Sequence, residues 1–208
     1  ILVVAQKIVS KVEGRTRDLA AFVAAEKAHE LAHATGRDPE MMQAILEESS
    51  QVLRRTPAAV IAAHRTGHVL ANAGIDASNV EGGEAGRVLL WPLDPDASAR
   101  VLRGELQKKC EVRIGVVIAD SMGRAWRIGT LGHAIGCAGL TVLEDRRGRA
   151  QDLYGRTLQA TVIGVADSVA AMAALAMGEG AEGTPAALVR GCERWVTEED
   201  GPGAVSGL

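Results

Sequence analysis

The amino-acid sequence predicts a mixed α+β fold in which the sheets are largely antiparallel. Apolar residues make up 47% of the 208-residue chain, which is ample for a buried core. Segments with strand and helix patterns are interleaved without a regular β-α-β period and without an internal repeat. We therefore expect residues 1–208 to fold as one unit, with two subdomains as the alternative.

The N-terminal part of the chain is predicted to contain one strand followed by two helices. Residues 1–9 have the apolar and β-branched pairs typical of a strand. Apolar residues recur at helical spacing over residues 24–35, and Gly36 supplies a C-terminal stop. An Asp-Pro pair then opens a second helix, which we expect over residues 39–55.

The middle of the chain is predicted to contain a hairpin, a short strand and an amphipathic helix. Residues 58–70, broken by Gly67, have the β-branched and apolar content of a hairpin. A short strand is expected near Leu89. The run Asp94-Pro95-Asp96 then introduces a helix over residues 97–108.

Residues 112–119 form a nearly continuous apolar run, which is typical of a strand covered on both faces. We expect this strand to end in a polar loop over residues 120–124, followed by glycine-rich turns up to Gly148. The remaining predicted elements are a strand, an alanine-rich helix and a last strand, at residues 158–165, 167–177 and 186–189.

Composition disfavours several classes of protein. The formal net charge is −3 and basic residues are scattered, so the chain lacks the basic stripe that binds nucleic acid. Aromatic residues make up only 2%, which disfavours base-stacking modules. The apolar opening stretch is too short for a membrane span or a secretory core. Three widely spaced cysteines form no disulfide framework and favour a reducing cytoplasm.

Polar clusters lie at the ends of predicted strands or hairpins, and we expect them to converge in the fold. They are Gln6-Lys7 with Lys11, Asp76 with Asn79, and Asp120-Ser121 with Arg124 and Arg127. Carboxylate and hydroxyl oxygens suit Mg²⁺ and Mn²⁺, which keep sites open for phosphate oxygens. Together with lysine ammonium groups, such a metal site is equipped for phosphoryl transfer.

Each of these features also has a purely structural explanation. Asp76 is explained as a turn residue that accepts a hydrogen bond from a backbone N–H. Asp120 is explained as a helix cap or as one partner of a surface salt bridge. Any single lysine is explained by ordinary solvation. The acidic loop Gly178–Pro185 either approaches a nucleotide or metal or is only a loop.

Familiar nucleotide-binding motifs are absent from the positions where they would be informative. The chain has no Gly-x-x-x-x-Gly-Lys-Ser/Thr phosphate loop and no Gly-x-Gly-x-x-Gly after a predicted strand. A nucleotide would therefore have to be bound by a different structural element. His29 and His33 are spaced i, i+4, and we interpret them as a helix-surface pair.

Taken together, the clusters resemble the F-420-0:gamma-glutamyl ligase family over nearly the whole chain. The resemblance is carried by motifs in the family's order: Gln6–Arg15, Asn72–Asn79, Asp94–Asp96, Asp120–Arg127, Asp152–Arg156 and Met177–Gly180. It implies the gamma-glutamyl ligase-type fold, one catalytic unit and an intertwined homodimer. Family members usually begin with a further segment that contains a Leu-Pro turn and a Gly-Asp-Asp stretch, so we expect an N-terminal segment to be missing.

The resemblance implies a GTP-dependent ligase of coenzyme F-420 biosynthesis that uses Mg²⁺ or Mn²⁺, two ions per site, with K⁺ as a further cation. GTP phosphorylates the terminal carboxylate of the deazaflavin precursor F-420-0, and the amine of L-glutamate displaces phosphate to form an amide. The implied metal ligands are Asp76, Asp120, Ser121 and Glu179, and the implied catalytic residues are Asp76, Asp120 and Lys11. The implied nucleotide contacts are Gln6, Lys7, Lys11, Asn79, Met177, Gly178, Glu179, Gly180, Gly183 and Thr184.

Arg124, Arg127 and Arg156 are candidates for binding a substrate phosphate or carboxylate through bidentate hydrogen bonds, with structural salt bridges as the alternative. Two other functions stay open. One is a ligase of the same fold that joins a different amine and carboxylate with ATP or GTP. The other is a nucleotide- or deazaflavin-binding protein without catalysis.

Overall fold

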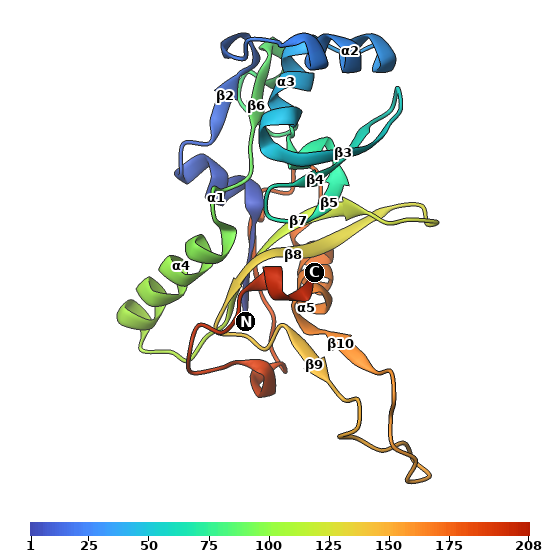
Figure 1. The fold of residues 1–208 in the computed structure, drawn as a ribbon. Helices are drawn as coiled ribbons and strands as arrows, with labels where there is room; N and C mark the ends of the chain where they lie inside the picture. Colours follow the sequence, from blue (N-terminus) through green and yellow to red (C-terminus); the bar gives the residue numbers. More distant parts are fainter.

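The computed structural model describes residues 1–208 and is built around a four-stranded mixed sheet with three smaller antiparallel sheets (Figure 1). The strands of the large sheet lie in the order β11-β1-β7-β8. Strands β1 and β7 are parallel, and the other neighbours are antiparallel. The predicted α+β class with largely antiparallel sheets is confirmed. The bounds of these strands are β1 (Leu2–Ala5), β7 (Val116–Gly123), β8 (Thr130–Ala138) and β11 (Ala186–Leu188).

Five α-helices and three small antiparallel sheets complete the fold. The small sheets are β2 (Thr16–Asp18) with β6 (Arg87–Leu89), β3 (Ser49–Arg55) with β4 (Val60–His64) and β5 (Val69–Ala71), and β9 (Leu143–Asp145) with β10 (Val162–Gly164). The helices are α1 (Gln6–Val12), α2 (Glu26–Thr35), α3 (Pro39–Glu48), α4 (Pro95–Cys110) and α5 (Val165–Met177). None of them is both long and apolar enough to cross a membrane.

Helices α4 and α5 cover opposite faces of the large sheet. Successive side chains of a strand point to opposite faces, so each buried strand contributes to two cores. Val117 and Ala119 belong to the apolar cluster that contains α5. Val116 and Ile118 belong to a second cluster that contains Ala99 of α4. The predicted strand with both faces covered is confirmed for residues 116–119, but residues 112–115 precede β7 and Val112 is exposed.

A separate apolar core holds the other end of the molecule together, where α2 and α3 pack beside the sheet of β3, β4 and β5 (Figure 1). Met42 and Ile45 of α3 and Val60 of β4 are fully buried in it. Trp91 is also fully buried and lies in the cluster on the α4 face of the large sheet. The preceding residue, Leu90, belongs to the core beside α2 and α3, so adjacent residues of the chain contribute to the two cores.

The predicted strand over residues 1–9 is wrong beyond Ala5, because helix α1 begins at Gln6. The side-chain amide of Gln6 donates a hydrogen bond to the Ser10 hydroxyl at 2.7 Å, and both residues are buried. Residues four apart share one face of a helix, so Lys7 and Lys11 lie together on another face. The Ile-Val pair between them looked like part of a strand. In the helix, Val9 packs against the apolar cluster on the α4 face of the sheet, whereas Ile8 is exposed.

The predicted helix over residues 39–55 is wrong after Glu48, because Ser49–Arg55 forms strand β3 and pairs with β4. Serine lowers helix propensity, and β3 is stabilised by pairing with β4, the next strand along the chain. Glu48 is buried at the junction and forms ion pairs at 3.0 Å with Arg15 and Arg65.

The predicted polar loop and glycine-rich turns after residue 119 are also wrong. Strand β7 continues to Gly123, and residues 130–138 form strand β8. The glycines of β8 serve helix packing: a Cβ on Gly132 would lie 2.5 Å from the Ala170 carbonyl of α5, and one on Gly136 would overlap Pro95 of α4. The predicted 58–70 hairpin is confirmed as β4–β5, and helices α2, α4 and α5 differ from prediction only at their ends.

Candidate active site

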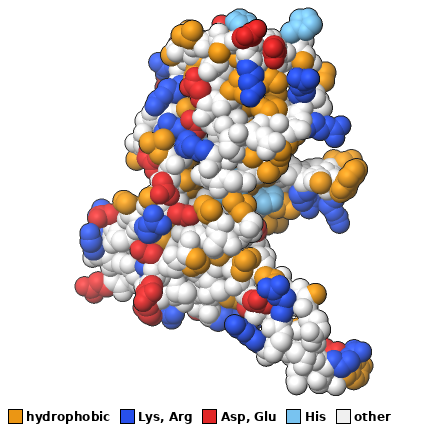
Figure 2. Space-filling model, viewed as in Figure 1, with side chains coloured by type: hydrophobic (Ala, Val, Ile, Leu, Met, Phe, Trp, Pro, Cys, Tyr) orange, Lys and Arg blue, Asp and Glu red, His pale blue; other side chains and the backbone are white.

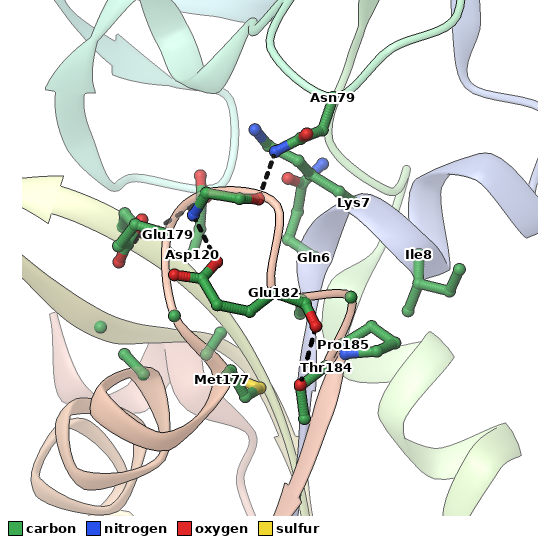
Figure 3. Close-up of a pocket in the computed structure, with 18 of the residues that line it drawn as sticks. Gln6, Lys7, Ile8, Asn79, Asp120, Met177, Glu179, Glu182, Thr184 and Pro185 are labelled. Carbon is green, nitrogen blue, oxygen red and sulfur yellow. Dashed lines mark hydrogen bonds between the residues drawn. The ribbon is translucent and has the colours of Figure 1, made fainter.

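A cavity of about 460 Å³ lies between helix α1, strand β7, the end of α5 and the loop that follows α5 (Figure 3). Its wall combines ammonium, carboxylate and hydroxyl groups with the backbone of the loop. The structure brings to this one cavity the following predicted metal and nucleotide residues: Gln6, Lys7, Lys11, Asn79, Asp120, Ser121, Met177, Gly178, Glu179, Gly180, Gly183 and Thr184.

Asp76 lies behind this lining and is connected to it through Lys7. The Lys7 Nζ lies 2.6 Å from Asp76 Oδ2 and also donates a hydrogen bond to the Ser78 hydroxyl. The backbone N–H and the hydroxyl of Ser78 donate to the Asp76 carboxylate at 2.7 and 2.9 Å. Burial opposes ionisation of Asp76, but the hydrogen bonds from Lys7 and Ser78 outweigh it and lower the pKa of the carboxyl. Asp76 is therefore both a turn residue and the partner of a cavity lysine.

Lys11 and Asn79 connect three segments across the mouth of the cavity. The Lys11 ammonium donates to the backbone carbonyl of Asn79 at 2.7 Å. The side-chain amide of Asn79 donates to the carbonyl of Gly180 at 3.1 Å (Figure 3). Asn79 has a φ of 54°, in the left-handed region that asparagine tolerates better than most residues. Helix α1, the turn before Val80 and the loop after α5 are thus joined.

Asp120 lies within strand β7, and its carboxyl accepts two hydrogen bonds. Trp91 Nε1 donates to Asp120 Oδ2 at 2.7 Å, and the Ser121 backbone N–H donates to Oδ1 at 2.8 Å. Burial is the largest effect, and it raises the pKa of Asp120 from 3.8 to about 6 despite these bonds. Asp120 caps no helix and forms no salt bridge, so neither structural explanation accounts for it. A desolvated carboxylate without an ion-pair partner favours a bound cation.

Ser121 and Glu179 connect strand β7 to the loop after α5. The Ser121 hydroxyl donates to Glu179 Oε1 at 2.6 Å. Consecutive strand residues point to opposite faces, which is why Asp120 contacts Trp91 while Ser121 contacts the loop. The loop 178–183 has the spacing Gly-x-Gly-x-x-Gly, but it follows a helix and leads into strand β11. That order is the reverse of the one in dinucleotide-binding folds.

Comparison with known proteins identifies the family. A family profile described as F420-0:Gamma-glutamyl ligase matches residues 1–191. The chain belongs to this family.

Several relatives carry the name "Coenzyme F420:L-glutamate ligase". The protein of Archaeoglobus fulgidus is 49% identical over 191 residues, which is 92% of this chain and 75% of the relative. The protein of Methanopyrus kandleri is 42% identical over 202 residues, which is 97% of this chain and 79% of the relative. The protein of Methanothermobacter thermautotrophicus is 44% identical over 191 residues, which is 92% of this chain and 74% of the relative. The protein described here is accordingly a ligase.

The donor atoms of the site match the chemistry of the divalent metal that the ligase family resemblance implies. Asp76, Asp120 and Glu179 offer carboxylate oxygens and Ser121 offers a hydroxyl, which are ligands suited to Mg²⁺ or Mn²⁺. No group of three His, Cys, Asp or Glu side chains gathers closely enough to hold a metal alone. Mg²⁺ commonly uses one or two carboxylates and completes its shell with substrate phosphates and water. The ligase site fits that mode of binding.

The three predicted substrate arginines lie outside the cavity. Arg124 and Arg127 are exposed near the tip of the hairpin between β7 and β8. Arg156 lies in the segment between β9 and β10, where its Nε is 2.7 Å from Asp152 Oδ2. For Arg156 the structural salt bridge, left open by the sequence, is present. The contribution of the three arginines to substrate binding stays a prediction.

The histidine pair on α2 is a surface feature. His29 and His33 are exposed, as their interpretation as a helix-surface pair requires. That interpretation left out Glu30, which completes the His-Glu-x-x-His spacing of zinc proteases. Glu30 is exposed as well, and no third candidate ligand joins the two histidines.

Sequence reasoning missed Trp91 as a part of the site. No motif singles it out, because its indole reaches Asp120 across 29 positions of the sequence. Its complete burial beside a polar partner is visible only in three dimensions. The only local signal is its position just before the Asp94-Pro95-Asp96 helix start.

Proposed function

We propose that this ligase uses GTP to form an amide bond between L-glutamate and the terminal carboxylate of the deazaflavin precursor F420-0, in the biosynthesis of coenzyme F420. The family description and the names of the relatives support these two substrates. One observation carries the proposal: a single cavity combines two lysines, carboxylates and a glycine-rich loop. Those groups are suited to hold nucleotide phosphates and a divalent cation beside an incoming carboxylate.

The reaction proceeds in two steps because a carboxylate is a poor acyl donor until one oxygen becomes part of a leaving group. First, a carboxylate oxygen of the precursor attacks the γ-phosphorus of GTP, the bond from phosphorus to the β–γ bridging oxygen breaks, and GDP leaves. The glutamate nitrogen then attacks the acyl carbon, and the carbon–oxygen bond to phosphate breaks. The nitrogen loses a proton, and inorganic phosphate departs with one oxygen of the original carboxylate.

The charged residues of the cavity have two different roles, which are binding of phosphate and binding of metal. Lys7 and Lys11 neutralise nucleotide phosphates, and the glycine-rich loop 178–183 forms part of the wall of the cavity beside the same anions. Divalent cations, for which Asp76, Asp120, Ser121 and Glu179 would supply oxygen ligands, neutralise charge on the transferred phosphoryl group when bound. The negative end of the α5 dipole lies beside Glu179 and favours a cation there.

We further propose that the ligase is a homodimer in the cytoplasm. Two hairpins project from the body of the molecule and carry apolar and basic side chains (Figure 2). Trp126 and Ile128 on one, and Leu153 and Tyr154 on the other, are almost fully exposed in the single chain. Exposed apolar groups of this size support a protein partner, for which a second copy is the simplest source. Three free cysteines support a reducing compartment.

The direct test is incubation of the protein with GTP, Mn²⁺, L-glutamate and F420-0, followed by mass spectrometry of the deazaflavin. We expect a gain of one glutamate residue for each amide formed, with release of equal amounts of GDP and phosphate. A parallel reaction with ATP tests the nucleotide. Nucleotide hydrolysis without a mass gain in the deazaflavin contradicts the proposal.

Asp120→Asn is expected to lower the ligation rate by about two orders of magnitude or more, because a carboxylate ligand is lost. Asp145→Asn is the matched control. Asp145 is ionised beside Arg147 on strand β9, and it does not line the cavity. Its replacement leaves the ligation rate unchanged, so an equal loss in both variants contradicts the assignment of Asp120.

A further inference from the structure

The segment Leu89–Trp91 contacts both of the aspartates proposed to bind metal. The backbone of Leu89 exchanges two hydrogen bonds with the backbone of Asp76, at 2.8 and 3.2 Å. Two residues later, the Trp91 indole N–H donates to the Asp120 carboxylate at 2.7 Å. Asp76 and Asp120 come from separate parts of the chain, so this segment is a direct physical link between them.

The Trp91 indole is fixed from every side. Its side chain is fully buried, and the rings of His64 and His68 lie against it at 4.7 and 5.4 Å between centroids. Gly74 approaches its nitrogen so closely that a Cβ at that position would overlap Nε1. The Trp91 carbonyl also accepts a hydrogen bond from Arg15 Nε at 2.7 Å. The indole N–H therefore has one direction available, toward Asp120.

We infer that Trp91 is a positioning residue, whose indole N–H orients the Asp120 carboxylate and, with Leu89, fixes its separation from Asp76. This inference rests on the proposed metal-dependent function. Hydrogen bonds that orient a metal-binding carboxylate typically change metal affinity by about 10- to 100-fold when they are removed. The N–H of Trp91 engages one lone pair of Oδ2 and so restricts rotation of the carboxylate. The remaining lone pairs of the Asp120 carboxylate are thereby oriented to bind a cation.

Replacing Trp91 with phenylalanine removes the N–H and keeps an aromatic ring between the histidines and Gly74. We expect the dissociation constant for Mn²⁺, measured by electron paramagnetic resonance without nucleotide, to rise by about tenfold. Trp195→Phe is the matched control, because Trp195 Nε1 donates to Glu144 at 2.8 Å away from the cavity. It loses the same kind of hydrogen bond and leaves Mn²⁺ affinity unchanged. Equal Mn²⁺ affinity in Trp91→Phe and the wild type overturns the inference.

A second measurement uses the wild-type protein and does not depend on how well Trp91→Phe folds. The chain contains three tryptophans, so its ¹⁵N–¹H spectrum has three indole signals. Trp126→Phe, at an exposed site, and Trp195→Phe assign two of them, which leaves Trp91. Titration with Mg²⁺ is expected to shift the Trp91 indole signal and leave the other two in place.

The spectra separate failure of this inference from failure of the proposed function. Backbone shifts around the cavity with an unmoved Trp91 indole signal overturn the positioning role and leave the metal site standing. If neither backbone nor indole signals shift on addition of Mg²⁺, with or without GTP, both the metal site and the positioning role of Trp91 are contradicted.

Discussion

The ammonium group of Lys7 lies 2.6 Å from the Asp76 carboxylate, at the place where a divalent cation would approach that aspartate. Lys7→Met is therefore expected to have opposite effects on two ligands. Mn²⁺ affinity without nucleotide rises by about tenfold, because a positive charge beside the metal is removed. GTP affinity falls by about tenfold, because a charge-assisted contact to phosphate is lost. Titrations with Mn²⁺ alone and with GTP in the presence of Mn²⁺ measure the two effects.

Lys108→Met is the control for that prediction. Lys108 is exposed on helix α4, pairs with Glu105, and does not line the cavity. The same change of charge there leaves both affinities as in the wild type. A Lys7→Met variant that weakens Mn²⁺ binding and GTP binding alike would show that Lys7 supports the metal ligands and does not compete with the metal.

Asp120 is expected to make the metal-free protein less stable as pH rises. Its pKa is raised from 3.8 to about 6, so the folded state holds the proton more tightly than the unfolded state. The stabilisation from that proton is complete below pH 4 and is lost as pH rises through 6. Between pH 4 and pH 8 the loss amounts to about 2 kcal/mol. Urea unfolding at several pH values, in the presence of a chelator, measures it.

Asp120→Asn isolates this contribution because asparagine does not titrate. The amide has one oxygen for the two donors, Trp91 Nε1 and the Ser121 N–H, so the variant starts with a cost of about 1–3 kcal/mol. We expect the variant to be less stable than the wild type at pH 4 and to recover most of the difference by pH 8. A stability difference that does not vary with pH contradicts a raised pKa of the half-buried Asp120 carboxyl.

Asn79 is expected to restrain the loop that follows helix α5. Its side-chain amide donates to the Gly180 carbonyl at 3.1 Å, across a gap of 101 residues in the sequence. Asn79→Ala removes this bond, so backbone amides of residues 178–184 should exchange with solvent faster by about fivefold, equivalent to about 1 kcal/mol. Hydrogen–deuterium exchange with mass spectrometry measures this. If the loop amides of the variant exchange as slowly as those of the wild type, Asn79 does not restrain the loop.

The proposed dimer predicts a sedimentation species of twice the chain mass at micromolar concentration. Trp126 and Ile128 at the tip of the β7–β8 hairpin are expected to lie in its interface, because both are fully exposed in one chain. Replacing both with serine should shift the equilibrium toward the monomer. Val23→Ser is a control, since Val23 is an equally isolated exposed apolar residue on another part of the surface. A strictly monomeric wild type contradicts the dimer.

Local sequence patterns predicted several elements that have clear caps or turns, although they missed strand β3, whose partner β4 follows directly in the chain. The Asp94 cap and Pro95 of helix α4 and the hairpin of β4 and β5 are examples of correct predictions. Strand β8 was missed because its glycines look like turns, whereas Gly132 and Gly136 make room for two helices that come from distant segments. Helix α1 was missed because two apolar residues in a short segment fit a strand equally well.

The candidate site, like the fold, was predicted only in part from the sequence. Polar residues beside apolar runs led us to expect that Lys7 and Asp120 converge. Both line one cavity together with the loop after α5, although Lys7 lies in helix α1 and Asp120 within strand β7. The polar loop expected around Asp120 is instead a strand, which directs Asp120 and Ser121 to different neighbours. Trp91 could not be found at all, since a buried tryptophan has no sequence signature that distinguishes an oriented indole N–H from ordinary packing.

The proposed function requires that a carboxylate bound in this cavity is phosphorylated before an amine attacks it. The most direct measurement uses F420-0 with ¹⁸O in its terminal carboxylate, together with GTP, Mn²⁺ and L-glutamate. An acyl phosphate pathway transfers one ¹⁸O atom to each molecule of inorganic phosphate and keeps one in the amide carbonyl, and mass spectrometry of the phosphate is expected to show it. Phosphate without ¹⁸O, released while the amide forms, would contradict an acyl phosphate intermediate.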